Sequence, residues 1–324
     1  MKADTISIAL CTYNGARFLR EQLASYVAQE RMPDELVVCD DGSTDDTLAI
    51  LRQFADSAPF EVRIELNPEK LGVARNFSRA IGLCSGDVIA LSDQDDIWFP
   101  NKLQVIGDSL AADGAIGMVF SDAVAIGANG RTLNYGLWDA VRFTRGERMS
   151  ARRGRLVNVL LRHYVVTGAT LAFHSAYREL VLPIPSHCLH DAWIGFLVAS
   201  VSQGRIIDEP LIGYRQHPTQ TSGGERILTL FDQMNRARAM MAEDHAATAA
   251  RFESIRERLA ESAYAPSRGT IMRRLDDKIL HVRNRERMHR NGSFLLPAVA
   301  EELLTGRYHR YSHPWKGPLA DLFL

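Results

Sequence analysis

The 324-residue chain lacks the features that mark several broad classes of protein. It has only four cysteines and no CxxC motif, which favours buried thiols in a reducing compartment. No apolar run reaches the ~18 residues of a membrane span. The first apolar run, residues 6–11, is too short for a signal peptide. We therefore expect a cytoplasmic protein.

Neither sign of charge dominates the sequence. The 38 Lys and Arg residues against 39 Asp and Glu residues give a net charge of −1, which argues against a general nucleic-acid-binding protein. The charge is uneven, because residues 225–324 hold 17 basic and 13 acidic residues, whereas the first 224 hold 21 and 26. The composition is that of a globular protein, and the length predicts one domain with a sizeable appendage.

Two glycine-rich nucleotide motifs are also missing. Neither GxGxxG nor the P-loop pattern follows the first apolar run, where residues 12–17 read TYNGAR. Their absence argues against a dinucleotide oxidoreductase and a P-loop enzyme. A nucleotidyltransferase would usually carry a glycine-rich basic loop at this place, and it is kept as an alternative.

The first 125 residues do contain an alternation of strand and helix patterns. Short, nearly continuous apolar runs predict buried strands, and amphipathic segments between them predict helices. This order is typical of an α/β fold whose mainly parallel sheet lies between helices and binds ligands at the carboxyl ends of its strands. The predicted strands are residues 6–11, 36–39, 62–66 and 88–92, and the predicted helices are 16–29, 73–84 and segments beginning near residues 44 and 101.

Three carboxylates follow the fourth predicted strand, at Asp93, Asp95 and Asp96. Carboxylates this close repel one another unless hydrogen bonds or a cation compensate. Mg²⁺ and Mn²⁺ prefer oxygen ligands and often bridge to substrate phosphates. The sequence therefore predicts a divalent metal site here, and a solvated acidic turn is the alternative.

Two more polar segments lie in the first half of the chain. Asp40, at the end of the second predicted strand, suits a base N–H or a ribose hydroxyl, or else caps a simple turn. Lys70 and Arg75 lie in NPEKLGVARN (67–76), where cations and a helix N-terminus suit a diphosphate. The alternative for this segment is an ordinary loop and helix start.

The second half has strand-like stretches at 165–173, 205–208 and 211–214, and an apolar helix from His190 to about residue 201. Asp191 in the first turn of that helix is a candidate general base, or else a helix cap. His217, just after the last strand pattern, is a candidate metal ligand or else a structural histidine. We place a domain boundary near Gly223, beyond which the chain is charged and helix-rich.

These segments occur in a fixed order at strand ends, and the ordered set resembles the inverting family 2 glycosyltransferases, whose fold is called GT-A. The set is Thr12-Tyr13-Asn14-Gly15, Asp40-Asp41-Gly42-Ser43, Asp93-Gln94-Asp95-Asp96, His190-Asp191 and Tyr214-Arg215-Gln216-His217. The resemblance implies a GT-A domain over residues 1–223, with a donor half at about 1–125 and an acceptor half at about 126–223. A helical extension follows over 224–324. The stretch LSDQDDIWFPNK (91–102) is most similar to bacterial rhamnosyltransferase-type members.

The resemblance also implies roles for single residues. Asp191 would be the catalytic base, and Asp95 and His217 would bind Mg²⁺ or Mn²⁺. The residues implied to bind the nucleotide and the donor sugar are Thr12, Tyr13, Asn14, Asp40, Lys70, Arg75, Asn76, Asp93 and Gln94. The residues implied on the acceptor side are His190, Trp193 and Trp98.

The implied reaction is an inverting transfer of a sugar from a dTDP- or UDP-linked donor, dTDP-L-rhamnose being our choice, to a glycan or lipid-linked acceptor in bacterial cell-surface polysaccharide synthesis. A processive synthase is not expected, because the chain has neither a QxxRW motif nor membrane spans. A nucleotidyltransferase and a non-catalytic sugar-binding domain are the alternatives.

Four arginines cluster near the C-terminus, at Arg283, Arg285, Arg287 and Arg290. Cationic side chains near anionic lipid contribute about 1 kcal/mol each. One hypothesis is therefore peripheral contact with the inner leaflet of the inner membrane. The alternative is a solvated helix face, because acidic residues are interleaved with the arginines.

Overall fold

In the computed structural model the chain divides into two compact units, residues 1–154 with 165–224, and residues 155–164 with 225–324. The structure describes residues 4–217, 242–264, 268–291, 295–312 and 316–323. The boundary predicted near Gly223 lies outside the described residues. Residues 155–164 group with the second unit, although the sequence analysis assigned them to the acceptor half.

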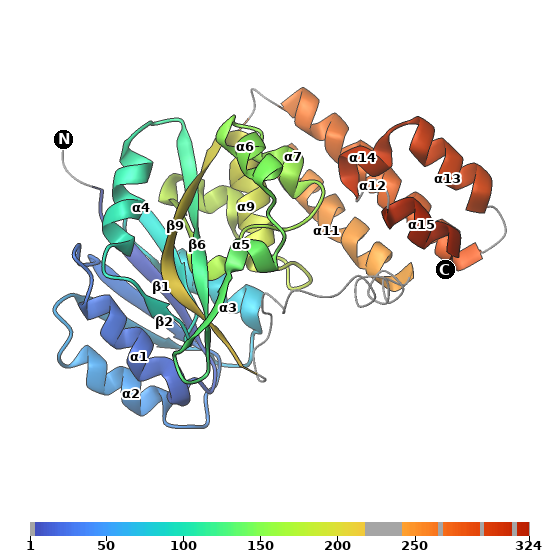
Figure 1. Cartoon of the computed structure of the whole chain (residues 1–324). Coiled ribbons are helices and arrows are strands. Elements are labelled where there is room, and N and C mark those ends of the chain that lie inside the picture. The colour runs from blue at the N-terminus through green and yellow to red at the C-terminus, as the bar shows by residue number, and fades with distance from the viewer. Residues whose placement is uncertain (1–3, 218–241, 265–267, 292–294, 313–315, 324) are drawn as a thin grey trace. The chain divides into compact units, whose positions relative to one another are not determined.

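The first unit is built on a nine-stranded sheet in the order β3-β2-β1-β4-β8-β6-β9-β5, with β7 paired to β6. Figure 1 labels β1, β2, β6 and β9 of this sheet and helices that surround it. Its first four strands are parallel, as predicted. They are β1 (Ile6–Thr12), β2 (Glu35–Asp40), β3 (Glu61–Leu66) and β4 (Val88–Ser92). The helices that connect or follow them are α1 (Ala16–Val27), α2 (Thr47–Ala55), α3 (Val73–Leu83) and α4 (Lys102–Ala111).

The rest of the sheet is mixed rather than mainly parallel. The strand β8 (Leu171–His174) runs antiparallel to both β4 and β6 (Ile116–Gly127), and β9 (Gln203–Gln216) runs parallel to β6. Two antiparallel steps restore the direction of β4, so the carboxyl end of β9 reaches the same edge of the sheet as the ends of β1, β2 and β4. The short strands β5 (Ile97–Trp98) and β7 (Thr132–Gly136) pair antiparallel with β9 and β6.

Alternation along the buried strands explains the two helical layers. In β1, the side chains of Ile6, Ile8 and Leu10 join one core cluster with residues of α1, α2 and α4. The opposite face of β1 and β2 packs against α3. The helix α9 (His190–Val201) is apolar almost all round and is buried accordingly. Cys39, Cys84 and Cys188 are buried free thiols, as predicted, and Cys11 is half-buried.

The shorter helices of the first unit are α5 (Leu137–Ala140), α6 (Arg145–Arg152) and α8 (Arg178–Val181), with single 3₁₀ turns at Gly168–Thr170 and Ser175–Tyr177. The helical extension predicted over 224–324 is confirmed in its described part, which contains α11 (Ala242–Glu261), α12 (Arg268–Asn291), α13 (Leu295–Leu304), α14 (Arg307–Tyr311) and α15 (Lys316–Phe323). The second unit also includes α7 (Leu156–Leu160), from the stretch predicted as the acceptor half. Among the described helices, none is long and apolar enough to span a bilayer.

The arginine cluster of α12 does not form a free basic face. Arg283 donates to both carboxylate oxygens of Glu253 on α11 and also pairs with Glu286. Arg285 binds both oxygens of the buried Asp321 on α15. Carboxylates of the same unit thus already bind these two guanidinium groups, and peripheral contact with a membrane stays a prediction. Arg287 is exposed, and the side chain of Arg290 lies outside the described residues.

Candidate active site

The acidic loop after β4 meets the end of β9 at the carboxyl edge of the sheet. The Nε2 atom of His217 lies 2.7 Å from Asp95 Oδ2, and both side chains are largely shielded from solvent. The Phe18 ring of α1 lies 4.9 Å from the His217 ring, centroid to centroid, and backs it. The two residues predicted to bind metal are thus brought together from positions more than 120 residues apart.

The carboxylates of this loop are electrostatically strained. Burial, with the nearby charges of Asp95 and Asp191, raises the pKa of Asp93 to about 7. Burial and the charges of Asp95 and Asp93 also raise the pKa of Asp96 well above its usual range. The buried Oδ2 of Asp96 has no hydrogen-bond partner among the described residues. A surplus of buried negative charge of this kind is what a divalent cation relieves, and carboxylate oxygens with one imidazole nitrogen suit Mn²⁺ or Mg²⁺.

The loop after β1 is joined to the acidic loop through Gln94. The Gln94 side chain accepts from the backbone N–H of Tyr13 at 2.9 Å and donates to the Tyr13 carbonyl at 3.0 Å. A Cβ atom at residue 15 would collide with the Gln94 amide, which explains the glycine at this position. Asn14 has φ of 49°, and its side-chain oxygen accepts from the backbone N–H of Thr44. The two hydrogen bonds between the Gln94 side chain and the Tyr13 backbone fix the first loop beside the carboxylates.

The Tyr13 ring is partly exposed beside this loop, and Lys70 Nζ lies 3.7 Å from its centroid. Lys70 and Arg75 are both exposed. Asp41 holds the segment that carries Lys70, since its carboxylate accepts from the backbone N–H groups of Leu71 and Gly72. The aromatic ring of Tyr13 and the ammonium group of Lys70 therefore flank the first loop on its solvent side.

Three polar residues predicted to touch the donor face inward. The Asp40 carboxylate is fully buried and accepts from Thr12 Oγ1 at 2.7 Å and from both the backbone and the hydroxyl of Ser43. The Asn76 amide is buried, donates to the Cys39 carbonyl and accepts from Asn67. Thr12, Asp40 and Asn76 thus organise the loops rather than present their side chains to solvent.

Helix α9 begins with His190 and Asp191. The Asp191 carboxylate accepts from the backbone N–H groups of Gly168, at 3.2 Å, and Ala192, at 2.7 Å. It is partly exposed, and its charge contributes to the raised pKa of Asp93. The buried His190 ring stacks on Phe77 with centroids 3.9 Å apart, and burial lowers the pKa of His190. Helix α9 thus brings a carboxylate close to the acidic loop.

A model of the glycosyl transferase family 2 matches residues 7–180, more than half of the chain. The chain belongs to glycosyl transferase family 2. The resemblance drawn from the ordered motifs is thereby confirmed.

This family 2 chain has curated relatives that it matches only in part. It is 28% identical over 223 residues to the uncharacterized glycosyltransferase alr2836 of Nostoc sp. PCC 7120, covering 65% of each protein. It is 38% identical over 110 residues to the dTDP-rhamnosyl transferase RfbG of Shigella flexneri, covering 33% of this chain and 38% of RfbG. Each match spans less than two thirds of the relative's length.

The fold of the family 2 chain is also found in solved structures. It superposes with a TM-score of 0.54 on the mannosyltransferase PcManGT from Pyrobaculum calidifontis, solved in complex with GDP-Man and Mn²⁺. The two chains are 18% identical, and the match covers 99% of this chain and 86% of the other. The predicted GT-A fold is thus confirmed.

Sequence reasoning missed two buried cations of this family 2 chain. Lys102 Nζ donates to the Ala169 carbonyl at 2.6 Å, and burial lowers the pKa of Lys102 to about 7 against the charges of Asp96 and Asp93. Arg215 is fully buried, and its guanidinium donates to the Asp95 carbonyl. Lys102 is the last residue of LSDQDDIWFPNK, and Arg215 lies within Tyr214-Arg215-Gln216-His217. A cation close in sequence to several acids, or to a candidate metal ligand, is the signal that could have indicated them.

The two tryptophans predicted on the acceptor side lie in the core instead. Trp193 is 2% exposed, and its indole N–H donates to the Val181 carbonyl of α8 at 2.8 Å. Trp98 is also 2% exposed and packs edge-on against Tyr26, with Lys102 Nζ 3.7 Å from the centroid of its indole. Both indole rings thus belong to the packed core, where large apolar side chains gain free energy from burial, and their contact with an acceptor stays a prediction.

Proposed function

We propose that this chain transfers a sugar from a nucleoside-diphosphate donor to a hydroxyl group of an acceptor, with inversion at the anomeric carbon. One observation carries the proposal: Asp93, Asp95 and His217 converge at the carboxyl edge of the sheet, within electrostatic reach of Asp191. Such a group combines ligands for a cation with a separate carboxylate for a proton.

Asp95 and His217 would hold Mg²⁺ or Mn²⁺, with Asp93 beside them. A divalent ion would neutralise the negative charge that develops on the departing diphosphate. Lys70 and Arg75 are exposed cations, Lys70 lies against the Tyr13 ring of the first loop, and both would lie along the phosphates and sugar. Tyr13, Asn14 and Gln94 would shape the nucleotide site, and Asp40, Thr12 and Asn76 would keep its loops in place.

Asp191 would act as the general base. The acceptor hydroxyl oxygen forms a bond to the anomeric carbon while the bond from that carbon to the diphosphate oxygen breaks. The hydroxyl proton passes to Asp191, and the nucleoside diphosphate leaves. The backbone N–H groups of Gly168 and Ala192 hold the Asp191 carboxylate in place in the first turn of α9.

For the donor we propose dTDP-L-rhamnose, supported by the motif resemblance and by the likeness to RfbG. For the acceptor we propose a glycan, free or lipid-linked, of a bacterial surface polysaccharide. A lipid-linked acceptor would bring the reaction to the cytoplasmic face of the inner membrane. Flotation with liposomes tests that contact, and binding independent of anionic lipid would contradict an electrostatic attachment.

Donor hydrolysis tests the proposed function without knowledge of the acceptor. The full chain is incubated with dTDP-L-rhamnose and Mn²⁺, and release of dTDP is followed for wild type and Asp95→Asn. Slow release that needs both Mn²⁺ and Asp95 supports a transferase. Tight nucleotide binding with no release, alone or with a panel of glycan acceptors, favours a non-catalytic sugar-binding domain. Release of pyrophosphate from a sugar phosphate and dTTP would favour a nucleotidyltransferase.

A further inference from the structure

We propose that His245, His289 and Asp321 form a binding site for a divalent transition-metal ion of the Zn²⁺ class inside the C-terminal helical unit. The three residues come from α11, α12 and α15, and one ligand atom of each lies within 4.8 Å of the others. Two imidazole nitrogens and one carboxylate oxygen are a ligand set suited to Zn²⁺ and Co²⁺. This site is separate from the sugar-transfer chemistry proposed above.

The clearest sign of a missing partner is at His245. This residue is 2% exposed, and its Nε2 atom has no hydrogen-bond partner among the described residues. A buried polar atom without a partner costs free energy, so such atoms are rare in folded proteins. Burial and the nearby positive charge of Arg285 lower the pKa of His245 to about 3. A neutral imidazole offers the lone pair of one ring nitrogen, and this is the form that binds a metal.

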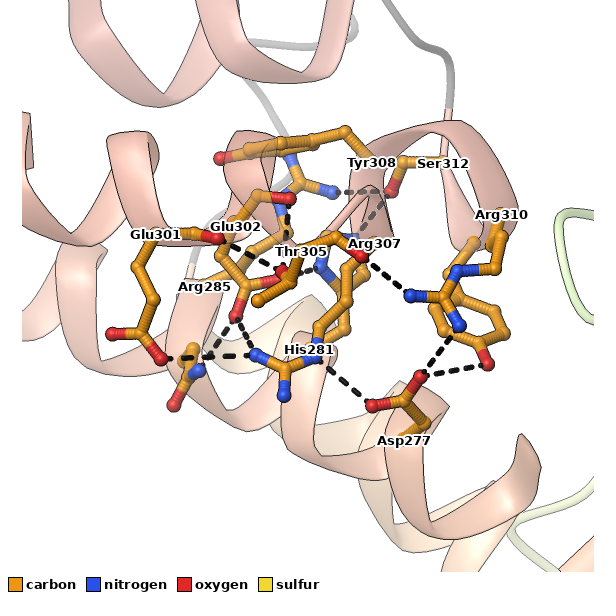
Figure 2. A network of polar contacts seen from close by, with 12 residues as sticks. Asp277, His281, Arg285, Glu301, Glu302, Thr305, Arg307, Tyr308, Arg310 and Ser312 are labelled. Atoms are coloured by element: carbon orange, nitrogen blue, oxygen red, sulfur yellow. Dashed lines mark hydrogen bonds and ion pairs between the residues drawn. The ribbon is translucent and has the colours of Figure 1, made fainter. Parts of the chain in front are cut away.

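Another histidine of the same unit, His281, has all of its hydrogen-bonding capacity used. His281 contacts Glu302 through Nδ1 at 2.6 Å and Ser312 through Nε2 at 2.8 Å, so both ring nitrogens have partners (Figure 2). Arg307 and Asp277 continue this network (Figure 2). The polar interior of the unit is thus well paired around His281, and the orphaned nitrogen of His245 stands out against it.

The other two proposed ligands, His289 and Asp321, are already spaced as two ligands of one ion would be. His289 Nε2 lies 3.1 Å from Asp321 Oδ1, close to the spacing of two ligands on one tetrahedral ion. The rings of His245 and His289 lie nearly parallel, 24° apart, with centroids 5.2 Å apart. When an ion binds, His289 would carry its proton on Nδ1, and Nε2 and Oδ1 would both turn their lone pairs to the ion.

Asp321 is held in place by an outer layer of hydrogen bonds. Arg285 donates to both of its oxygens at 2.7 Å, and the Tyr308 hydroxyl donates to Oδ2. Metal-ligating carboxylates are commonly fixed by such second partners. Arg285 occupies one direction at Oδ1, and the direction now used by His289 is the one that an ion would take. An ion there would join α15 to α11 and α12.

Metal titration of the full chain tests the site directly. The protein is stripped with EDTA, dialysed and titrated with Zn²⁺ by calorimetry, and with Co²⁺ by visible absorption. Asp95→Asn serves as the starting protein in a parallel series, because it removes a ligand of the candidate active site. We expect one equivalent of Zn²⁺ that persists in Asp95→Asn, a four-coordinate Co²⁺ spectrum, and a rise in Tm.

His245→Gln and His289→Gln should each lose this equivalent and the Co²⁺ spectrum. His309→Gln, which changes an exposed histidine of α14, should keep both. Circular dichroism checks that the variants fold. If they do not, the Co²⁺ spectrum and stoichiometry of Asp95→Asn decide alone. Absence of bound Zn²⁺ in Asp95→Asn, or equal binding in folded His245→Gln, would overturn the proposal and leave a hydrogen-bonded network.

Discussion

At the scale of single residues, a substitution of Asp191 distinguishes an effect on catalysis from an effect on donor binding. In Asp191→Asn the remaining side-chain oxygen can accept from one of the two N–H groups, of Gly168 or of Ala192, that now donate to separate carboxylate oxygens, but the amide cannot take a proton. We expect kcat to fall by about 10²–10⁴, the usual contribution of general base catalysis, with donor affinity retained. Steady-state kinetics and nucleotide titration together check this. A loss of nucleotide affinity as large as the loss of turnover would count against the base role.

Arg215 is predicted to position the metal ligands rather than touch substrate. Its backbone N–H donates to Asp96, its guanidinium donates to the Asp95 carbonyl at 2.6 Å, and it also binds Glu21. Arg215→Lys keeps the charge and the backbone bond to Asp96, but its single ammonium group cannot bind both the Asp95 carbonyl and Glu21 as the guanidinium does. Breaking a buried charged network typically costs about 3–5 kcal/mol, and we expect a loss near the lower end because the charge remains.

Urea unfolding and Mn²⁺ titration measure the Arg215 effect. We expect Arg215→Lys to be less stable and also to bind Mn²⁺ more weakly, because the Asp95 loop loses its anchor. Glu21→Gln is the matched control, since the Glu21 side chain is half exposed and retains an acceptor. Wild-type Mn²⁺ affinity in a folded Arg215→Lys would contradict the positioning role.

At the scale of elements, the local apolar pattern predicts where a strand or helix lies better than it predicts how far a strand extends. The strands β2 and β4 and the helix α9 lie where unbroken apolar runs place them. In contrast, β9 was expected as two short strands because charged residues and Pro210 interrupt its pattern. It is one strand because its register with β6 shifts beside Pro210, which absorbs the interruption. That compensation depends on a partner strand distant in sequence.

The same limit applies to the candidate site. Strand-end logic is enough to bring Asp95, His217 and Asp191 towards one edge, because it depends on topology. It does not give side-chain direction, so the inward-facing Asp40 and the buried Trp193 were assigned to ligand contacts. Only tertiary packing decides whether a polar side chain after a strand faces solvent or its own loop.

The packing of α11 on α12 should respond to acid. Burial and Arg285, with His289, lower the folded-state pKa of His245 to about 3, while Asp321 opposes the shift and His281 adds to it. An unfolded histidine titrates near 6.5. Between these values the unfolded state binds a proton that the folded state does not, so stability rises with pH and is lost as pH falls below about 6.5.

This titration contributes at most about 1.4 kcal/mol per pH unit. Urea unfolding at pH 5, 6 and 7, in EDTA, measures it. We expect the unfolding free energy of His245→Gln to change less steeply with pH than that of wild type. Identical slopes would show that His245 is protonated equally in both states.

At the scale of the whole molecule, the nucleotide chemistry and the metal proposed between helices belong to different units. The acidic loop, the first loop and the end of β9 all lie in the first unit, whereas His245, His289 and Asp321 lie in the second. We therefore expect nucleotide with Mn²⁺ to protect amides of the first unit from hydrogen exchange. Zn²⁺ should protect amides of α11, α12 and α15. The assignment would be contradicted if nucleotide with Mn²⁺ protected only the second unit and Zn²⁺ protected only the first.

The central claim is that Asp95 and His217 bind a divalent ion that holds a nucleoside diphosphate. Thermal unfolding with dTDP, UDP, GDP and CMP, each with and without Mn²⁺ or Mg²⁺, tests it most directly. A ligand at 100 times its Kd stabilises by about 2.7 kcal/mol, a readable shift. We expect stabilisation by a diphosphate, dTDP by our choice, only when metal is present, and we expect Asp95→Asn to lose it. Equal stabilisation without metal, or an unchanged shift in Asp95→Asn, would contradict the claim.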